Sequence, residues 1–373
     1  MQQFEKFYPC EGQEFKATMQ AFAESELFPM LASRLYPSAD VEAVRRQICA
    51  LDDVDQFQQQ FMYAGTRWVI DNTMSGFTYG GEQHLDGTPS LFISNHRDIV
   101  LDAMLLQYIL VSRGQRGTHV VVGSNLYEMP LMAALARANK MMPISRGGTP
   151  REYYASLMEM SAALRHFVVQ RGESAWIAQR NGRTKDGCDR TDPALLKMIA
   201  ASDRRGTPAQ SLEAMHIVPV SISYEWEPCA LLKARELALR QLGPYVKAPG
   251  EDTQSIVTGV TDYKGAVHIA IGEPLTPAEL QGCGGDFNAV ARLLDARIQE
   301  GYRLYPNNHC AYRLAQSEGL EGFTAASRAV GAVTPAQEQA FRDYLDDACR
   351  RHPDIPALRQ RLITLYASPL LAD

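Results

Sequence analysis

Residues 90–102, SLFISNHRDIVLD, place a histidine and two carboxylates directly after a short hydrophobic run. His96 is followed by Asp98 and Asp102, within one or two turns of a helix that begins there. A carboxylate bound to one ring nitrogen fixes the imidazole tautomer and makes the other nitrogen a better general base. The alternative is a helix N-terminus at which Asp98 favours the helix dipole and His96 is merely solvated. Spacing alone leaves both interpretations open.

A second polar cluster, QRNGRTKDGCDR at residues 179–190, also follows a hydrophobic run. Glycine lets a backbone approach an anion, and arginine offers two parallel donors to a phosphate. A third segment, residues 142–148, has the form of a strand followed by Arg146 and two glycines. Each of these could be a solvated charged loop, but together they indicate a phosphate-bearing substrate beside a histidine base. The cations of the second cluster are Arg180, Arg183, Lys185 and Arg190.

Short β-type runs alternate with helical patterns from residue 90 to residue 272, which predicts an α/β layered fold with a mostly parallel sheet. Sites in such sheets form at the carboxyl ends of strands, where the three polar clusters fall. The candidate strands are Ser90–Ser94, His119–Gly123, Lys140–Ser145, Ser174–Gln179, His216–Tyr224 and Ala266–Gly272. The candidate helices between them are Asp98–Arg113, Leu126–Ala138, Pro150–Arg171, Pro193–Ser202 and Ala230–Leu242.

Helical patterns flank this region on both sides. Residues 1–80 are predicted to be helical, up to a glycine-rich break at Tyr79-Gly80-Gly81. After Pro274 the pattern is helical again, and Asp286 is expected to cap the next helix. The clearest helical stretches are Ala17–Leu35, Val41–Phe61, Pro335–Arg351 and Pro356–Tyr366.

Composition narrows the class of protein. The 373 residues carry 37 Lys+Arg against 43 Asp+Glu, a formal net charge of -6, which argues against a general nucleic-acid binder. The seven cysteines are odd in number and widely spaced, so we expect reduced thiols, a cytoplasmic location and no metal site. The N-terminus lacks a signal-peptide pattern, and no apolar run approaches the roughly 20 residues of a spanning helix.

Four ordered segments resemble the sequence blocks of the glycerolipid acyltransferases, a family that includes the glycerol-3-phosphate and lysophosphatidate acyltransferases. Their order and spacing make the resemblance far more specific than any one segment. The resemblance implies a layered acyltransferase-type fold, with an acyltransferase domain at residues 76–280, a helical N-terminal segment at 1–75 and a helical C-terminal extension at 281–373. The segments are Asn95-His96…Asp102, Ile144-Ser145-Arg146, Ile177–Arg183 and Ile217-Val218-Pro219-Val220.

The resemblance implies transfer of a fatty acyl group from acyl-CoA or acyl carrier protein to a hydroxyl of a glycerol-3-phosphate- or lysophospholipid-like acceptor, in phospholipid biosynthesis. The thioester is a co-substrate, and no bound cofactor or metal is expected. By position, His96 is the general base and Asp102 its orienting carboxylate, with Asp98 as the alternate. The substrate-binding residues would be Asn95, Arg146, Arg180, Asn181, Gly182, Arg183 and Lys185.

Two departures from the family pattern indicate a divergent member. Asp102 lies six residues after His96, where the family usually has five, and Asn181-Gly182 stands where it usually has Glu-Gly. Two other classes of function stay open. One is a hydrolase that uses the same His/Asp pair on water, and the other is a non-catalytic lipid-binding protein.

A lipid acceptor also implies contact with a membrane surface. Without a spanning segment, we expect peripheral binding through apolar side chains near the mouth of the site, with the N-terminal helices as leading candidates. The alternative is that the same helical face simply packs on the rest of the protein. The face consists of Phe22, Leu27, Phe28, Leu31 and Leu35.

Overall fold

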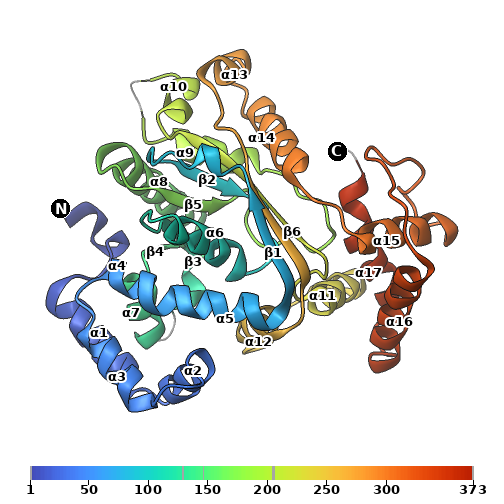
Figure 1. Ribbon diagram of the computed structural model, residues 1–373. Coiled ribbons are helices and arrows are strands. Elements are labelled where there is room, and N and C mark those ends of the chain that lie inside the picture. Colours follow the sequence, from blue (N-terminus) through green and yellow to red (C-terminus); the bar gives the residue numbers. More distant parts are fainter. Residues whose placement is uncertain (1, 128–129, 146, 204–205, 372–373) are drawn as a thin grey trace.

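A seven-stranded sheet forms the centre of the computed structural model, which describes residues 2–127, 130–145, 147–203 and 206–371 (Figure 1). The strand order is β1-β7-β6-β2-β5-β3-β4. From β6 to β4 all neighbours are parallel, whereas β7 runs antiparallel to β6 and pairs in parallel with β1. The strands are β1 (Met74–Gly80), β2 (Leu91–Ser94), β3 (His119–Gly123), β4 (Met141–Ile144), β5 (Ala175–Ala178), β6 (Ile217–Tyr224) and β7 (Gly265–Ile271).

The predicted α/β fold is confirmed, and all six candidate strands are present with each end within one residue of the prediction. The central strands β2, β5 and β6 are buried on both faces. This explains why β2 and β5 appear in the sequence as short hydrophobic runs, whereas the apolar residues of β6 alternate with Pro219, Ser221 and Ser223. Ser94 pairs with both Ala178 and Val220. The chain therefore leaves β2 and β5 at the same level of the sheet.

The prediction that residues 1–80 are entirely helical is wrong at its end, because residues 74–80 form β1. This edge strand pairs only with β7, and most of its residues are exposed or half-buried. A bulge between Met74 and Gly76 interrupts the alternation that would otherwise have marked it as a strand.

Helices cover both faces of the sheet. On one face, α6 packs Leu105 and Ile109 against Phe92 and Trp176. On the other face, α8, α9 and α14 pack against Ile93, Ile177 and their neighbours. Asp286 caps α14 as expected, accepting a hydrogen bond from the amide of Asn288 at 2.9 Å. These helices are α5 (Tyr63–Thr73), α6 (Leu101–Ser112), α7 (Pro130–Ala138), α8 (Pro150–Arg165), α9 (Pro193–Ala200), α10 (Pro208–Glu213), α13 (Pro277–Gly282) and α14 (Phe287–Gly301).

The N-terminal helices form a hydrophobic cluster of their own at the lower left of Figure 1. Phe22 and Phe28 are buried there beside Phe61, so the face considered for membrane contact packs inside the protein. The predicted helix Ala17–Leu35 is interrupted at Ser25. In a continuous helix the ring of Pro29 would clash with the carbonyl group of Ser25, four residues earlier. The helices are α1 (Gly12–Glu24), α2 (Leu27–Leu35), α3 (Val41–Ala50) and α4 (Val54–Phe57).

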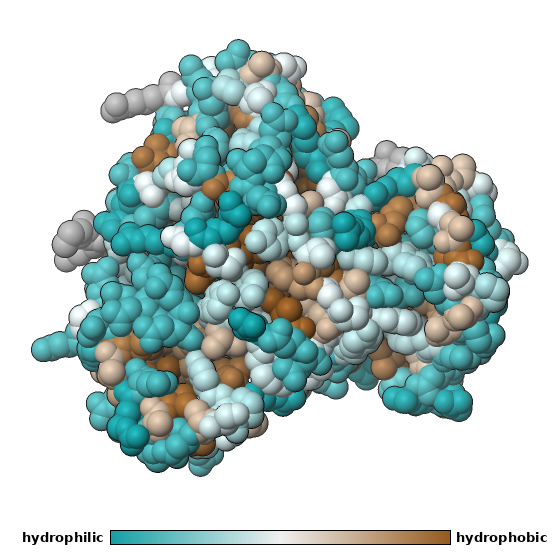
Figure 2. Space-filling model, viewed as in Figure 1, coloured by the Kyte–Doolittle hydropathy of each residue, from teal (hydrophilic) through white to brown (hydrophobic). Residues whose placement is uncertain are grey.

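The C-terminal helices gather on the opposite side of the sheet, where they pack with α11 around an aromatic group that includes Trp226, Phe341 and Tyr366 (Figure 1). Hydrophilic residues cover most of the face shown in Figure 2, and hydrophobic residues appear in separate patches. Within the described ranges, no helix combines the length and apolar character needed to cross a membrane. The remaining helices are α11 (Ala230–Leu242), α12 (Glu251–Thr261), α15 (Pro306–Ser317), α16 (Pro335–Arg351) and α17 (Leu358–Ala367).

Candidate active site

A cleft of about 490 Å³ opens at the carboxyl ends of β2, β3, β4 and β5. Parallel strands bring their ends to one edge of the sheet, so the clusters after β2 and β5 meet there, as does Ser145 after β4. Arg146 lies outside the described residues. One part of the lining is apolar and consists of Val122, Leu126, Ile144, Leu157, Trp176, Ile177, Leu195 and Met198.

His96 lies in this cleft beside a buried carboxylate. Its Nδ1 is 2.9 Å from Oδ2 of Asp102, which is fully buried in the first turn of α6. The same oxygen accepts hydrogen bonds from the amides of Arg97 at 2.6 Å and Asp98 at 2.9 Å. Because Asp102 engages Nδ1, Nε2 is the nitrogen left for a substrate in the cleft. The pair has the arrangement of a general base and its orienting carboxylate.

Tyr224, the last residue of β6, completes the surroundings of Asp102. Its hydroxyl donates to Oδ1 of Asp102 at 2.9 Å. Burial, followed by the charges of Asp102 and Asp98, raises the pKa of Tyr224 well above its ordinary value, so the hydroxyl remains a donor. The sequence pattern places Tyr224 among the inward residues of a buried strand but gives no sign that its hydroxyl meets a carboxylate 122 residues away.

Asp98 has a different role from Asp102. Its Oδ1 accepts hydrogen bonds from the amides of Val100 and Leu101, both at 2.9 Å, at the start of α6. Burial, with a smaller contribution from Asp102, raises the pKa of Asp98. Helix α12 lies so close that a Cβ atom on Gly259 would be 2.2 Å from Oδ2 of Asp98. The structure thus brings Asp102 to His96 and uses Asp98 to start the helix.

Asn95, a predicted substrate-binding residue, is fully buried behind the cleft. Its side chain exchanges two hydrogen bonds with the backbone of Ile222, at 2.9 and 2.8 Å, and donates to Asp189 at 3.0 Å. These contacts occupy both ends of the amide. Asn95 therefore fastens the turn after β2 to β6 and does not line the cleft.

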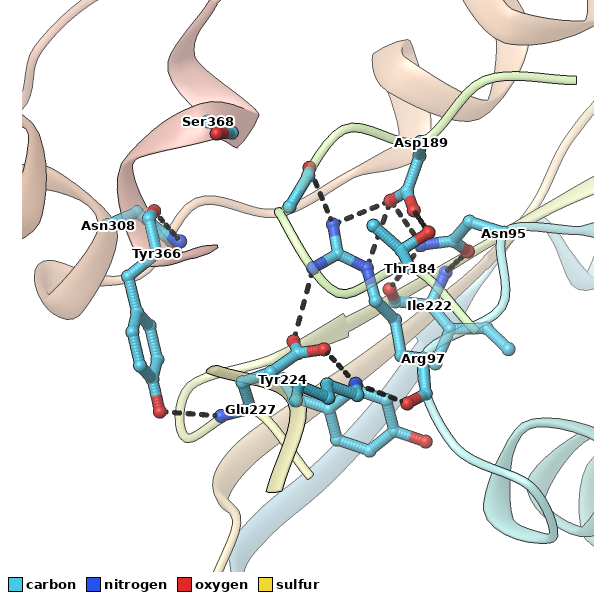
Figure 3. Close-up of polar contacts among 12 residues, drawn as sticks. Asn95, Arg97, Thr184, Asp189, Ile222, Tyr224, Glu227, Asn308, Tyr366 and Ser368 are labelled. Carbon is cyan, nitrogen blue, oxygen red and sulfur yellow. Dashed lines mark hydrogen bonds and ion pairs between the residues drawn. The ribbon is translucent and has the colours of Figure 1, made fainter. Parts of the chain in front are cut away.

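A buried ion network, which sequence reasoning missed, holds the same turn (Figure 3). Arg97 is 1% exposed and binds Asp189 through Nε and Nη2 at 3.0 and 2.6 Å, and Glu227 through Nη1 at 3.2 Å. Lys233 binds Glu227 and the carbonyl of Arg97, each at 2.5 Å. Two cations thus face two carboxylates, and the local charge is balanced. The partners of Arg97 are 92 and 130 residues away, so no local pattern could reveal them.

The network also reaches the C-terminal helices. The amide of Glu227 donates to the hydroxyl of Tyr366 on α17 at 3.0 Å, and the guanidinium of Arg97 lies 5.2 Å from the ring centre of Tyr302 (Figure 3 shows the Tyr366 contact). The C-terminal extension is therefore in direct contact with the elements that hold the turn of His96.

The turn after β5 brings the remaining predicted residues into the cleft. Arg180 makes no hydrogen bond or ion pair with any part of the chain that the structure describes. Arg183 donates to Ser255 at 3.2 Å, and Lys185 is bound to Glu236, with burial lowering the pKa of Lys185. Gly182 has φ of +79°, a left-handed conformation that favours glycine. Asn181 is exposed and lines the cleft beside them.

Two cations at the cleft were not predicted from the sequence. Arg240 at the end of α11 pairs with Glu236 at 2.6 Å, and Lys247 in the following loop pairs with Asp252 at 2.5 Å. Nothing local distinguishes either one from an ordinary surface charge. In the described ranges, no group of three or more His, Cys, Asp or Glu side chains could hold a metal ion.

Comparison with known proteins identifies part of the chain. Residues 76–223 match the family model described as Acyltransferase, which confirms the family resemblance seen in the sequence. No curated protein matches significantly. Among solved structures, the chain is similar to the 1-acyl-sn-glycerophosphate (LPA) acyltransferase PlsC from Thermotoga maritima, with 13% identity and a TM-score of 0.43 over 77% of this chain and 94% of that chain.

Proposed function

We propose that the protein transfers a fatty acyl group from a thioester to a hydroxyl of a phosphate-bearing acceptor, on the basis of the match of residues 76–223 to the Acyltransferase family model. The observation that carries the proposal is the His96–Asp102 pair in a cleft whose lining combines apolar residues with the cations of the turn after β5. An acyl chain suits the apolar residues, and a phosphate suits the cations.

The reaction follows from the position of Nε2 of His96. As this nitrogen removes the proton of the acceptor hydroxyl, the oxygen attacks the thioester carbon and forms the new C–O bond. The C–S bond then breaks, and the leaving thiolate takes the proton from the imidazolium. Asp102 stabilises the imidazolium through Nδ1, and Tyr224 with the amides of Arg97 and Asp98 holds Asp102 in place.

The acceptor we propose is glycerol-3-phosphate or a lysophospholipid, and the donor is acyl-CoA or acyl carrier protein. Arg180 is the best-placed group for the acceptor phosphate, because it lines the cleft without a partner among the described residues. Arg183 and Lys185 add positive charge on the same turn. The product would enter phospholipid synthesis at the cytoplasmic face of a membrane.

Product analysis tests this proposal. The purified protein is incubated with palmitoyl-CoA or palmitoyl acyl carrier protein and with glycerol-3-phosphate or 1-acylglycerol-3-phosphate, and lipids are identified by mass spectrometry. We expect a new ester that is absent with His96→Ala. Release of free fatty acid at the same rate with and without acceptor would indicate a hydrolase. Absence of any ester with both acceptors would overturn the proposal.

A further inference from the structure

The α11–α12 loop, taken together with the last residue of α11 as residues 242–250, is unusually apolar for an exposed segment. Its sequence is LGPYVKAPG, with Lys247 as the one charged residue. Leu242 is 71% exposed and Val246 is 85% exposed, the two largest values for large hydrophobic side chains in the described part of the chain. Isolated exposed apolar residues are ordinary, whereas several that lie together mark an interaction surface, and Leu242 and Val246 lie on one short segment.

Hydrogen bonds fix the loop in this conformation. Glu251 accepts from the hydroxyl of Tyr245 at 2.6 Å and from the amide of Ala248 at 3.1 Å. Lys247 pairs with Asp252, which also accepts from Asn125 at 3.0 Å. The acidic residues that follow the loop are therefore turned toward the protein and hold it. Leu242 and Val246 project into solvent from an ordered loop.

The loop borders the candidate active site. Lys247 directly follows Val246 and lines the cleft, as does Arg240, two residues before Leu242. Another part of the lining comes from the first turns of α8, where Tyr153 lines the cleft and Tyr154 beside it is 64% exposed. Tyrosine is favoured where protein meets a membrane surface, because its ring is apolar and its hydroxyl is polar. Exposed apolar groups thus come from two segments that both contribute to the cleft.

We propose that Leu242 and Val246, together with Tyr153 and Tyr154, dock the protein on a lipid bilayer so that the cleft opens at the membrane surface. The inference rests on the proposed function, since an acceptor or product with acyl chains resides in the bilayer. Aliphatic side chains gain free energy on entering the interface, and Lys247 at the loop lies at the level of lipid phosphates. The buried N-terminal face of Phe22 and Phe28 is not available for this contact.

Sedimentation with vesicles tests the docking surface. The protein and the double variant Leu242→Ser/Val246→Ser are mixed with phosphatidylcholine vesicles with and without phosphatidylglycerol. We expect the double variant to partition about tenfold or more weakly, because two aliphatic side chains are lost from the interface. The matched control is Met30→Ser on α2, which is 59% exposed and should change partitioning less than about twofold. Both sites are exposed, and unchanged circular dichroism verifies the fold.

Three outcomes would overturn the docking surface: no binding of the unmodified protein, equal binding of the double variant, or a larger loss with Met30→Ser. If the double variant loses turnover only when acyl carrier protein is the donor, and its vesicle binding is unchanged, the loop binds acyl carrier protein and not the bilayer. Ester formation is measured separately with a short-chain, water-soluble acceptor, and should be equal in the double variant. Vesicle binding that depends on Leu242 and Val246, without any ester formation, would support the docking surface and refute the proposed reaction.

Discussion

Two turns at the same edge of the sheet are built in opposite ways. The turn after β2, residues 95–101, has its polar side chains engaged inside the protein, from Asn95 on the backbone of β6 to Arg97 on two carboxylates. The turn after β5, residues 179–187, presents exposed Asn181 and an arginine that no described residue binds. The first turn fixes the proposed general base in place, and the second leaves positive charge available for the proposed phosphate ligand.

The difference shows how one fold separates reaction from recognition. A general base must be held within a fraction of an ångström of its working position, and this requires partners on every side. A cation that binds a substrate must lack an internal partner, because an ion pair within the protein would compete with the phosphate. Arg97 and Arg180 illustrate the two cases: Asp189 and Glu227 neutralise Arg97, whereas no residue that the structure describes neutralises Arg180.

The largest effect is expected at the first turn, from His96→Ala. Loss of the general base should lower kcat by about 10²–10⁴, while the thermal unfolding temperature changes little. Steady-state kinetics with the identified acceptor measure the loss, and differential scanning calorimetry verifies the fold. More than a third of the normal turnover in the purified variant would remove His96 from the reaction.

The two aspartates of the first turn should behave differently. Asp102→Asn should lower kcat by about a hundredfold or more, because the amide no longer stabilises the imidazolium. Asp98→Asn should change kcat less than about threefold, since asparagine and aspartate cap helices about equally well. The two variants are compared by kinetics and by thermal unfolding side by side. The reverse ranking would make Asp98 the orienting carboxylate.

At the second turn, Arg180→Ala should raise the KM for the acceptor by about tenfold to a hundredfold, the usual worth of a hydrogen-bonded charge pair. Arg180→Lys should raise the KM for the acceptor by an intermediate amount, because lysine keeps the positive charge but lacks the planar pair of donors. Arg240→Ala is the control, since Arg240 lines the same cleft but is already paired with Glu236. Equal effects of Arg180→Ala and Arg240→Ala would mean that an internal partner does not matter for recognition here.

The smallest effect should come from Tyr224→Phe, which removes one hydrogen bond to Asp102 and lowers kcat about two- to tenfold. Without this donor Asp102 is held less firmly against Nδ1 of His96. The KM values should change less than about twofold, because Tyr224 does not line the cleft.

The control for Tyr224→Phe is Tyr312→Phe, which removes a hydroxyl from a residue that is equally buried but lies in the C-terminal cluster. It should leave kcat unchanged. If both variants lose the same stability and neither lowers kcat, Tyr224 only supports packing and does not position Asp102.

The sequence predicts the central sheet well because each buried strand is either a short hydrophobic run or, in β6, a regular alternation of apolar and small polar residues. Edge strand β1 is not predicted, because a bulge and two glycines remove the alternation of apolar and polar residues that indicates a strand. The position of His96 at a strand end follows from the same pattern. These features are local, and periodicity detects them.

The rest of the site depends on contacts between distant parts of the chain. The choice between Asp98 and Asp102 depends on which carboxylate meets the amides of residues 97 and 98, and two spacings were compatible with the sequence. From the sequence alone, Arg97 could equally be a solvated cation, because its partners Asp189 and Glu227 lie far from it along the chain. Asn95 seemed suited to a ligand for the same reason, since its partner Ile222 lies 127 residues away.

Gly259 lets α12 pack directly against the turn after β2. A helix interior with glycine is less favourable by about 1 kcal/mol than one with alanine, yet any side chain here would overlap the carboxylate of Asp98. To accommodate a methyl group, α12 would have to move outward by roughly 1 Å or more. Asp252 on the same helix lines the cleft and would move with it. A chain with a larger residue at this place would therefore hold α12 farther from the turn after β2 and place Asp252 differently at the cleft.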